Sequence, residues 1–341
     1  MRVRWGDGKV PNSAYQTSAY GRAVAHSTKT MWDVISSEDG RWRIPLCLAT
    51  IDEQHVDAVS PYGYPGIHVD PDLTSAEIDD AWAQTLGALI ERNVVSVFFR
   101  FTPYSPGIEL NHALPGLEVR HVSDTIIVPI TDESLMWAAM QGRSRTAVRK
   151  AEREQLSASV APARFDELSG DMSGFRRVYD VAMDRVHASP VHRHSDEYYR
   201  ILTSAAELDV QLVSVKDANG EVVAACLLLV DEDAVHYQLS GSQASAARLG
   251  ANNLLIWSAM RWAFENRHAR LHLGGGTARD DSLFRFKVSF GGLVAPFRVG
   301  RLVVDADAYE RLVEIRAVEH GTTREVILSS NHFPAYRAPI S

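Results

Sequence analysis

The chain has 341 residues, of which 45% are hydrophobic and 23% charged, and its formal net charge is −8 at pH 7. One hydrophobic core stops growing near ~250–300 residues, so we expect two domains. The acidic balance excludes non-specific nucleic-acid binding by the whole surface but leaves room for a local basic patch. No apolar run approaches the ~20 residues that span a bilayer. The opening MRVRWGDGKVPNS lacks the apolar stretch of a signal peptide, so we expect a cytoplasmic protein without a membrane span.

The first half of the chain predicts an α/β unit. An aliphatic strand over 42–51 is followed by the turn segment SPYGYPG. A helix begins at Thr74, where Glu77 completes a capping box, and its apolar residues recur at helical spacing. The run VVSVFFRF (94–101) then predicts a buried strand.

A strand over 124–130 and one long helical stretch connect the two halves. Asp132 is the expected N-cap of this stretch. Its second part carries five cations: Arg143, Arg145, Arg149, Lys150 and Arg153. Three of them recur at i, i+4 and i+8 and form one stripe. The stripe predicts either a footprint for an RNA backbone or a solvated helix face that neighbouring glutamates dilute.

The second half repeats the order of elements seen in the first. Strands are expected over 221–230 and 234–242, followed by a buried helix over 252–264 that is apolar nearly all round. The segment RLHLGGG (270–276) predicts a further strand that ends in a glycine turn. We therefore predict an α/β fold of two similar halves, each with a central mixed sheet flanked by helices.

The predicted domain boundary lies near residue 155, giving domains over 1–155 and 156–341. A short helix over about 306–320 is closed by Gly321. The tail after it is irregular and is expected to return to the first domain. We expect a monomer.

The cysteines and clustered histidines do not predict a metal site. Cys47 and Cys226 both sit in apolar runs, which is typical of buried core thiols. His187, His192 and His194 lie in a polar stretch without cysteines at zinc-ligand spacing. We therefore expect no bound metal and leave the role of the three histidines open.

The segment LHLGGGTARDDSLFRFKVSFGG (271–292) is the strongest candidate for chemistry. Backbone N–H groups of its glycine turn can approach an anion closely, and Arg279 follows the turn. If the next part is extended, Phe284, Phe286 and Phe290 share one face and Lys287 points the other way. Lys287 is then either a solvated lysine of an edge strand or a cation aimed at a phosphate or a developing negative charge.

This segment resembles the C-terminal signature of the FemABX family. Four further stretches resemble family blocks in the same order: YQTSAYGRA, SPYGYPG, RSRTAVRKAER, and HYQLSGS with RLGANNLLIWSAMRWA. The resemblance covers about residues 13–305 and is to the shorter members without a coiled-coil arm. It implies two tandem GNAT-like domains and transfer of an amino acid from aminoacyl-tRNA to an amine. The usual acceptor is a peptidoglycan precursor, and relatives in natural-product pathways use other small amines or peptides.

The resemblance also implies roles for single residues. Lys287 matches the signature lysine, which stabilises the tRNA end and the charge that forms at the ester, and Tyr237 matches a cleft tyrosine. The residues implied in binding the acceptor are Arg22, Arg193, Tyr198, Tyr62 and Tyr64, and those implied in binding tRNA are Arg143, Arg145, Arg149, Lys150 and Arg279. Thr102 and Pro103 stand where the family often has Asp-Pro, which sets the cell-wall acceptor in question.

Two other functions compete with tRNA-dependent transfer. Acyl-CoA-dependent GNAT enzymes bind the pyrophosphate at a Q/R-x-x-G-x-G/A turn before a helix. The corresponding SQASAARLGANN (242–253) has a glycine, but its other motif positions are degraded. A non-catalytic binding module is the third reading. No cofactor is expected beyond aminoacyl-tRNA as co-substrate, with coenzyme A in its place in the second reading.

Overall fold

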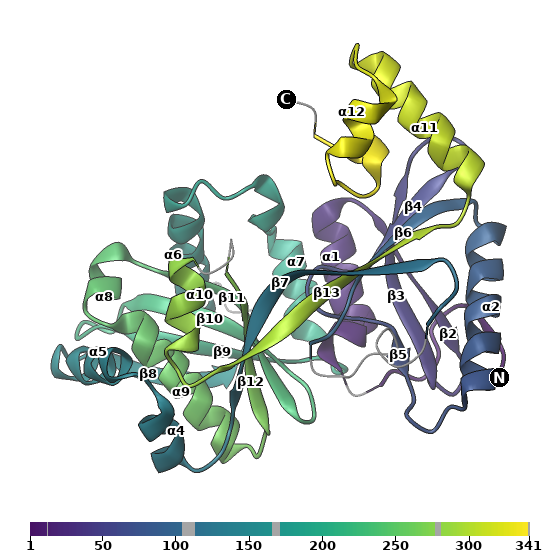
Figure 1. The fold of residues 1–341 in the computed structure, drawn as a ribbon. Helices are drawn as coiled ribbons and strands as arrows, with labels where there is room; N and C mark the ends of the chain where they lie inside the picture. The colour runs from purple at the N-terminus through teal and green to yellow at the C-terminus, as the bar shows by residue number, and fades with distance from the viewer. Residues whose placement is uncertain (12, 104–112, 166–170, 277–280, 340–341) are drawn as a thin grey trace. The chain divides into compact units, whose positions relative to one another are not determined.

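The computed structural model describes residues 1–11, 13–103, 113–165, 171–276 and 281–339. The chain divides into two compact units (Figure 1). Unit 1 comprises residues 1–11, 15–122 and 297–341, and unit 2 comprises residues 12–14 and 123–296. This division differs from the predicted boundary near residue 155, and residues 297–341 belong to unit 1.

Strand pairing explains why the boundary lies earlier than predicted. The second part of β7 (Leu117–Pro129) pairs with β12 (Arg270–Gly275) of unit 2, so it joins that unit and takes the following helices with it. The second part of β13 (Leu293–Val303) pairs with β6 (Val94–Arg100), which returns the end of the chain to unit 1.

The sheet of unit 1 has the order β1-β2-β3-β4-β6-β13. Its other strands are β1 (Val3–Trp5), β2 (Met31–Ser37), β3 (Trp42–Thr50) and β4 (Val56–Val59), and the short β5 (His68–Val69) pairs with β3. Helix α2 (Ser75–Glu91) packs its buried Trp82 and Leu89 into the same core as Trp42 and Leu46 of β3. Residues that alternate with these along β3 face the opposite side of the sheet, so Arg43 donates from Nε to the Gln16 carbonyl, just before α1 (Ser18–Thr28).

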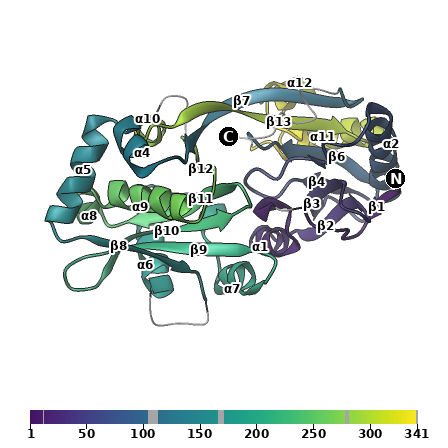
Figure 2. The ribbon, with the colours of Figure 1, turned by 90° about the horizontal axis from the view of Figure 1, so that it is seen from below.

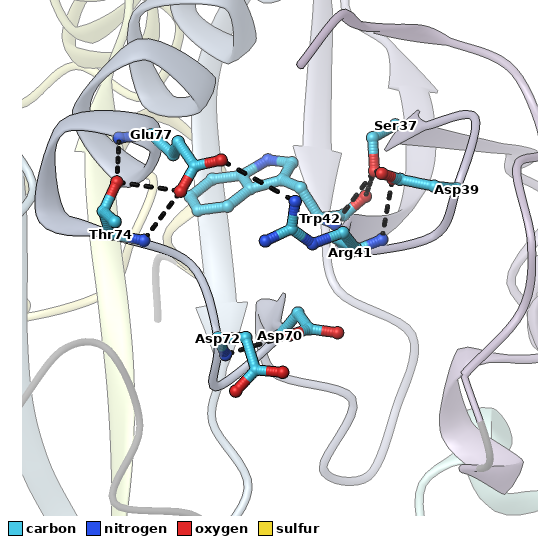
Figure 3. Close-up of polar contacts among 8 residues, drawn as sticks. All are labelled: Ser37, Asp39, Arg41, Trp42, Asp70, Asp72, Thr74 and Glu77. Carbon is cyan, nitrogen blue, oxygen red and sulfur yellow. Dashed lines mark hydrogen bonds and ion pairs between the residues drawn. The ribbon is translucent and has the colours of Figure 1, made fainter.

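Helix α2 begins where the sequence predicts. The Glu77 backbone N–H donates to the Thr74 hydroxyl, and the Glu77 carboxylate accepts the Thr74 backbone N–H at 2.9 Å (Figure 3). The guanidinium of Arg41 lies 3.7 Å from the same carboxylate and adds an ion pair. The capping box is thus confirmed, because both donors of the first turn are satisfied.

The C-terminal segment forms a small cluster on unit 1. Helix α11 (Ala306–Glu319) ends before Gly321, whose φ of +58° is confirmed as the left-handed residue that closes a helix. Helix α12 (Arg324–Ser329) and the turn η3 (Ala335–Arg337) follow. Tyr309 and Tyr336 pack with Val95 of β6 in a separate core cluster.

The sheet of unit 2 has the order β7-β12-β11-β10-β9-β8. Its other strands are β8 (Ser157–Pro162), β9 (Asp209–Lys216), β10 (Val222–Val230) and β11 (Ala234–Ser242). Helices α4 (Glu133–Ala139), α5 (Gly142–Arg153) and α9 (Ala251–Glu265) cover one face, and α6 (Asp171–Arg185) covers the other (Figure 2). The remaining elements are η1 (Ala14–Gln16), η2 (Pro190–His192), α7 (Asp196–Ser204), α8 (Ala244–Arg248) and α10 (Ser282–Val288).

Both units are therefore α/β with mixed sheets and flanking helices, and the predicted fold class is confirmed. Two element predictions are wrong. The long helical stretch after Asp132 is two helices, because Met140 and Gln141 adopt extended backbone angles. The segment around Lys287 is the helix α10 and not a strand, because the Asp281 side chain caps its first turn by accepting the Phe284 N–H. Cys47 and Cys226 are buried, as expected.

No helix within the described ranges is long and apolar enough to span a membrane.

Candidate functional site

Two parallel strands of unit 2 part at a defined position. Strands β11 and β12 pair only over residues 234–236 and 270–272. Directly after this stretch both strands are irregular: Gln238 is the extra residue of a bulge against β10, and the pairing of β12 with β7 shifts between His272 and Gly274. A bulge bends and twists its strand locally. Open α/β sheets bind ligands beyond the carboxyl ends of such strands, so this is the candidate active site.

Two buried histidines mark the point of separation. His236 and His272 are the last paired residues of β11 and β12, and both are 1% exposed. Their rings meet edge to face with centroids 5.7 Å apart. Nε2 of His236 lies 2.8 Å from Oδ2 of Asp231, and the other oxygen of that carboxylate accepts the Ala14 backbone N–H. The sequence analysis did not single out these residues.

The environment of His272 keeps its ring neutral. Burial lowers the pKa of His272 well below its ordinary value, and repulsion from His236 and from the Lys287 ammonium lowers it further. The influence of Lys287 means that these side chains form one electrostatic cluster. A histidine directly followed by an apolar residue, as in His236-Tyr237 and His272-Leu273, is the only sequence signal for them, and it is weak.

Lys287 reaches this cluster from α10. Its side chain is 8% exposed, and Nζ donates a 2.7 Å hydrogen bond to the carbonyl of Gly275, at the end of β12. Burial lowers the pKa of Lys287 to about 8, and the Asp281 carboxylate opposes this shift. Roughly nine in ten molecules therefore carry the ammonium at pH 7. The helix makes Lys287 a buried, anchored cation, whereas the expected strand would have left it on a polar face.

Tyr237 follows His236 on β11, and its side chain packs with the core under α9. Burial is the main cause that raises the pKa of Tyr237, the nearby Cys226 adds to the rise, and a hydrogen bond with Ser240 opposes it. Its neighbours are thus residues of the sheet, and the described contacts do not bring Tyr237 and Lys287 into one cluster.

The predicted acceptor residues are spread over both units. Arg22 is exposed on α1, Tyr62 is 53% exposed, and the Tyr64 ring packs edge to face on Phe297 at 5.1 Å; all belong to unit 1. Tyr198 of unit 2 is 1% exposed and stacks on His194 at 3.9 Å, which makes it a core residue of α7.

Arg193, the last of the predicted acceptor residues, lies within the stretch that contains His187, His192 and His194. Nη2 of Arg193 binds Oδ1 of Asp184 at 2.6 Å. Burial lowers the pKa of His194 to about 4, so its ring is neutral at pH 7. Within the described residues, no group of three or more His, Cys, Asp or Glu side chains has the arrangement of a metal site.

The basic stripe of α5 is partly used inside unit 2. Nη1 of Arg145 donates to the carbonyls of Ala138 (3.1 Å) and Met140 at the end of α4. Nζ of Lys150 donates at 2.9 Å to the carbonyl of Arg248, the last residue of α8. Cations at these positions satisfy helix-terminal carbonyls, a structural task that the sequence reading did not assign them.

The other cations of the predicted tRNA set have separate surroundings. Arg143 is exposed and donates from Nη2 to the Arg285 carbonyl at 3.0 Å. Arg149 is exposed and places its guanidinium 5.2 Å from the centroid of the Trp137 ring. Arg279 lies outside the described residues.

Helix α5 also covers the place where a GNAT enzyme would bind pyrophosphate. Gly250, with φ of +94°, is the N-cap of α9. A Cβ at Gly250 would lie 2.2 Å from the carbonyl oxygen of Ala147 on α5. The N-terminal end of α9 is therefore in direct backbone contact with another helix, which leaves less room for an anion there.

Comparisons with known proteins agree with this architecture. Residues 142–287 match the family model of the acetyltransferase (GNAT) domain. Among solved structures, FemX is similar with a TM-score of 0.69 at 13% identity, over 88% of this chain and 95% of FemX. L-PGS from Bacillus licheniformis has a TM-score of 0.55 at 16% identity, over 86% of this chain and 93% of that one. A tandem GNAT protein from the clavulanic acid biosynthesis pathway has a TM-score of 0.50 at 9% identity, with 89% and 99% covered.

A search of curated protein sequences finds no significant match. The family match lies wholly within unit 2, the unit that holds the parted strands and Lys287. The sequence resemblance is thereby confirmed at the level of fold: the chain is similar in fold to FemX and to a tandem GNAT protein, and residues 142–287 match the acetyltransferase (GNAT) domain model.

Proposed function

We propose that this protein is an aminoacyltransferase that moves an amino acid from aminoacyl-tRNA to the amine of a small-molecule or peptide acceptor. The observation that carries the proposal is the Lys287 ammonium, anchored on the Gly275 carbonyl at the open end of β11 and β12. It is a fixed positive charge beside the place where a GNAT-type fold holds its reacting carbonyl.

The reaction needs alignment and charge stabilisation more than a strong base. The acceptor nitrogen attacks the ester carbonyl, the oxyanion forms, and the tRNA hydroxyl then leaves with the proton that the amine gives up. An α-amine has a pKa near ~8, so a useful fraction is neutral at pH 7. Alignment supplies roughly 7–11 kcal/mol, and loss of an oxyanion donor costs about 3–4 kcal/mol. Lys287 takes the second task, and Tyr237 of β11, which lies outside the Lys287 cluster, is the second residue that we propose for it.

The neutral His272 and the Asp231–His236 pair serve as positioning residues. His236 is held by Asp231 at 2.8 Å and supports the His272 ring, which shares the electrostatic environment of Lys287. A neutral His272 ring does not compete for the positive charge of Lys287, which we propose acts on the developing oxyanion.

Contact between α5 and α9 favours tRNA over coenzyme A as donor. The Ala147 carbonyl of α5 lies against Gly250, the N-cap of the helix at whose N-terminus a CoA pyrophosphate would bind, and we take this close contact as unfavourable for an anion there. The exposed Arg143 and Arg153 of α5 are the proposed contacts to the tRNA backbone, with Arg279 as a third. Arg145 and Lys150, bound to helix carbonyls, position α5 for these contacts.

The acceptor is the less defined partner. Arg22 and Tyr62 are exposed and Arg193 is accessible beside Asp184, so these three are proposed to contact it, together with the half-buried Tyr64. The buried Tyr198 acts through the packing of α7. We propose action in the cytoplasm, where charged tRNA is made, and by a monomer.

The test is a donor competition with the purified chain. A mixture of charged tRNAs and, separately, acetyl-CoA are supplied with a panel of amines, and amide products are measured at two salt concentrations. Amide formed only from charged tRNA, and weakened by salt, supports the proposal. Amide formed only from acetyl-CoA means that the rival GNAT activity, favoured by the family match over 142–287, is the real one.

A further inference from the structure

A second pocket of unit 2 lies apart from the parted strands. It has a volume of about 560 Å³ and is lined by Asp132, Glu133, Ser134, Trp137, Arg149, Glu152 and Trp257. These residues come from α4 and its N-cap, the C-terminal half of α5 and the middle of α9, and these helices lie on the same face of the sheet (Figure 2). The volume is within the ~300–1,000 Å³ of small-molecule sites.

Two indole rings form the aromatic part of this pocket. The centroids of Trp137 and Trp257 are 5.0 Å apart, with the ring planes 60° to each other. Trp257 is 6% exposed and Trp137 is half-buried, so packing holds both rings in place. Indole is the side chain whose face attracts cations most strongly.

Carboxylates give the pocket an acidic lining. Asp132, Glu133 and Glu152 oppose the single cation Arg149. Hydrogen bonds from the Ser134 hydroxyl and backbone N–H lower the pKa of Asp132, so it is ionised at neutral pH. Glu133 shares its charge with Arg261 at 3.2 Å. The lining therefore favours positive ligands and disfavours phosphates.

The guanidinium of Arg149 already lies on the face of the Trp137 ring, where we infer that a ligand cation binds. This guanidinium stands 5.2 Å from the centroid of the Trp137 ring, within the ~6 Å range of a cation–π interaction. Arg149 is exposed, and a long exposed side chain can leave such a position at small cost. The Arg149 side chain therefore occupies the face of the Trp137 ring and competes there with any other cation.

We propose that this pocket is a binding site for an organic cation with a guanidinium head group, which takes the place of Arg149 on Trp137 and is held by the Glu152 carboxylate. The site is independent of the transfer reaction proposed above. An arginine-containing peptide segment and a free guanidinium metabolite present the same head group to it.

The experiment measures binding of N-acetyl-L-arginine amide to the full chain by calorimetry, beside its neutral isostere N-acetyl-L-citrulline amide. A ligand of this size is expected to bind at about 1 mM or tighter. The citrulline compound should bind about tenfold more weakly or worse, since it lacks the charge. Equal binding of the two compounds, or no binding of the arginine compound at 10 mM (about ten times the expected constant), would overturn the proposal.

Further variants are expected to change the affinity for N-acetyl-L-arginine amide in opposite directions. Glu152→Gln should weaken binding about threefold to tenfold, whereas the matched control Glu154→Gln, an exposed residue outside the lining, should not change it. Trp137→Leu should weaken it about tenfold. Arg149→Gln should tighten it by severalfold, because the internal competitor is gone.

Weaker binding in Arg149→Gln, or unchanged binding in both Glu152→Gln and Trp137→Leu, contradicts the proposal. Peptides with one arginine in a flexible segment then separate the two sources of the head group. Tighter binding of such a peptide than of N-acetyl-L-arginine amide identifies a protein partner, and equal binding identifies a small metabolite.

Discussion

Asp57 of β4 and Arg337 near the end of the chain form an ion pair across 280 residues of sequence. Asp57 is 5% exposed and also accepts the hydroxyl of Tyr336, which lies 3.1 Å from the hydroxyl of Ser96. The carboxylate therefore ties the last turn of the chain to two strands of unit 1.

Asp57→Ala is expected to destabilise unit 1 by about 1–3 kcal/mol, because it removes the acceptor of the hydrogen bonds from Tyr336 and Arg337. Arg337→Ala should also destabilise unit 1, because it leaves the buried Asp57 carboxylate without its cation. Urea unfolding followed by fluorescence measures both. The control is Arg324→Ala, which breaks an exposed ion pair with Glu310 and should change stability by less than about 0.5 kcal/mol. Equal effects of Asp57→Ala and Arg324→Ala contradict this account.

Lys287→Ala is expected to reduce turnover at least tenfold with the fold intact, because it removes the anchored charge at the open strand ends. Arg285→Ala serves as control, since Arg285 is exposed on the same helix. Steady-state amide formation and circular dichroism provide the two measurements. Turnover of Lys287→Ala equal to that of wild type removes Lys287 from the mechanism.

The pKa of about 8 for Lys287 predicts a pH dependence of turnover. The ammonium is lost as pH rises through 8, so kcat should fall on the alkaline side with an apparent pKa near 8. Lys287→Arg keeps the charge and should lack this fall. A pH profile of kcat from 6 to 10 for both proteins tests it, and an identical alkaline limb in the two would assign the titration to another group.

Stability should change in the same pH range with a defined sign. The folded pKa of Lys287 is below the value of an unfolded lysine, so the unfolded chain binds more protons between about pH 8 and 10.4. The Lys287 contribution to stability therefore rises with pH across this window. The difference in urea midpoint between wild type and Lys287→Met should shrink as pH increases, and a constant difference would contradict the lowered pKa.

His272 is expected to remain neutral well into acid, because burial and the nearby His236 and Lys287 lower its pKa. Its imidazole NMR shifts, assigned by their loss in His272→Gln, should stay constant from pH 8 to 5. The unfolded chain protonates this residue near 6.5, so its contribution to stability falls as pH drops below that value. Titration of the His272 signal near pH 6.5 would show that the ring is not enclosed as described.

The sequence predicts local structure well where one chemical signal dominates. Thr74 and Glu77 define the start of α2, and Gly321 defines the end of α11, because capping geometry depends on a few adjacent residues. The predicted strand around Lys287 is wrong because its alternating phenylalanines also suit a short helix. The Asp281 cap favours the helix over the strand.

Contacts between residues far apart in the sequence could not be predicted, for a different reason. Neither the pairing of His236 with His272 nor the contact of Ala147 with Gly250 has a local signal, because each depends on which strands and helices become neighbours. The division into units has no local signal either, since it depends on the partners of β7 and β13. Lys287 was found from its own segment and from the family resemblance, and its role is still a proposal.

The interrupted course of unit 1 has a consequence for synthesis on the ribosome. Residues 123–296 are nearly all of unit 2 and emerge as one stretch, so this unit can fold while translation continues. Unit 1 lacks its β13 strand and the Asp57 partner Arg337 until residues 297–341 appear. The half of the protein that is made first is thus completed last, and nascent chains stopped before residue 297 should expose the edge of β6 to chaperones.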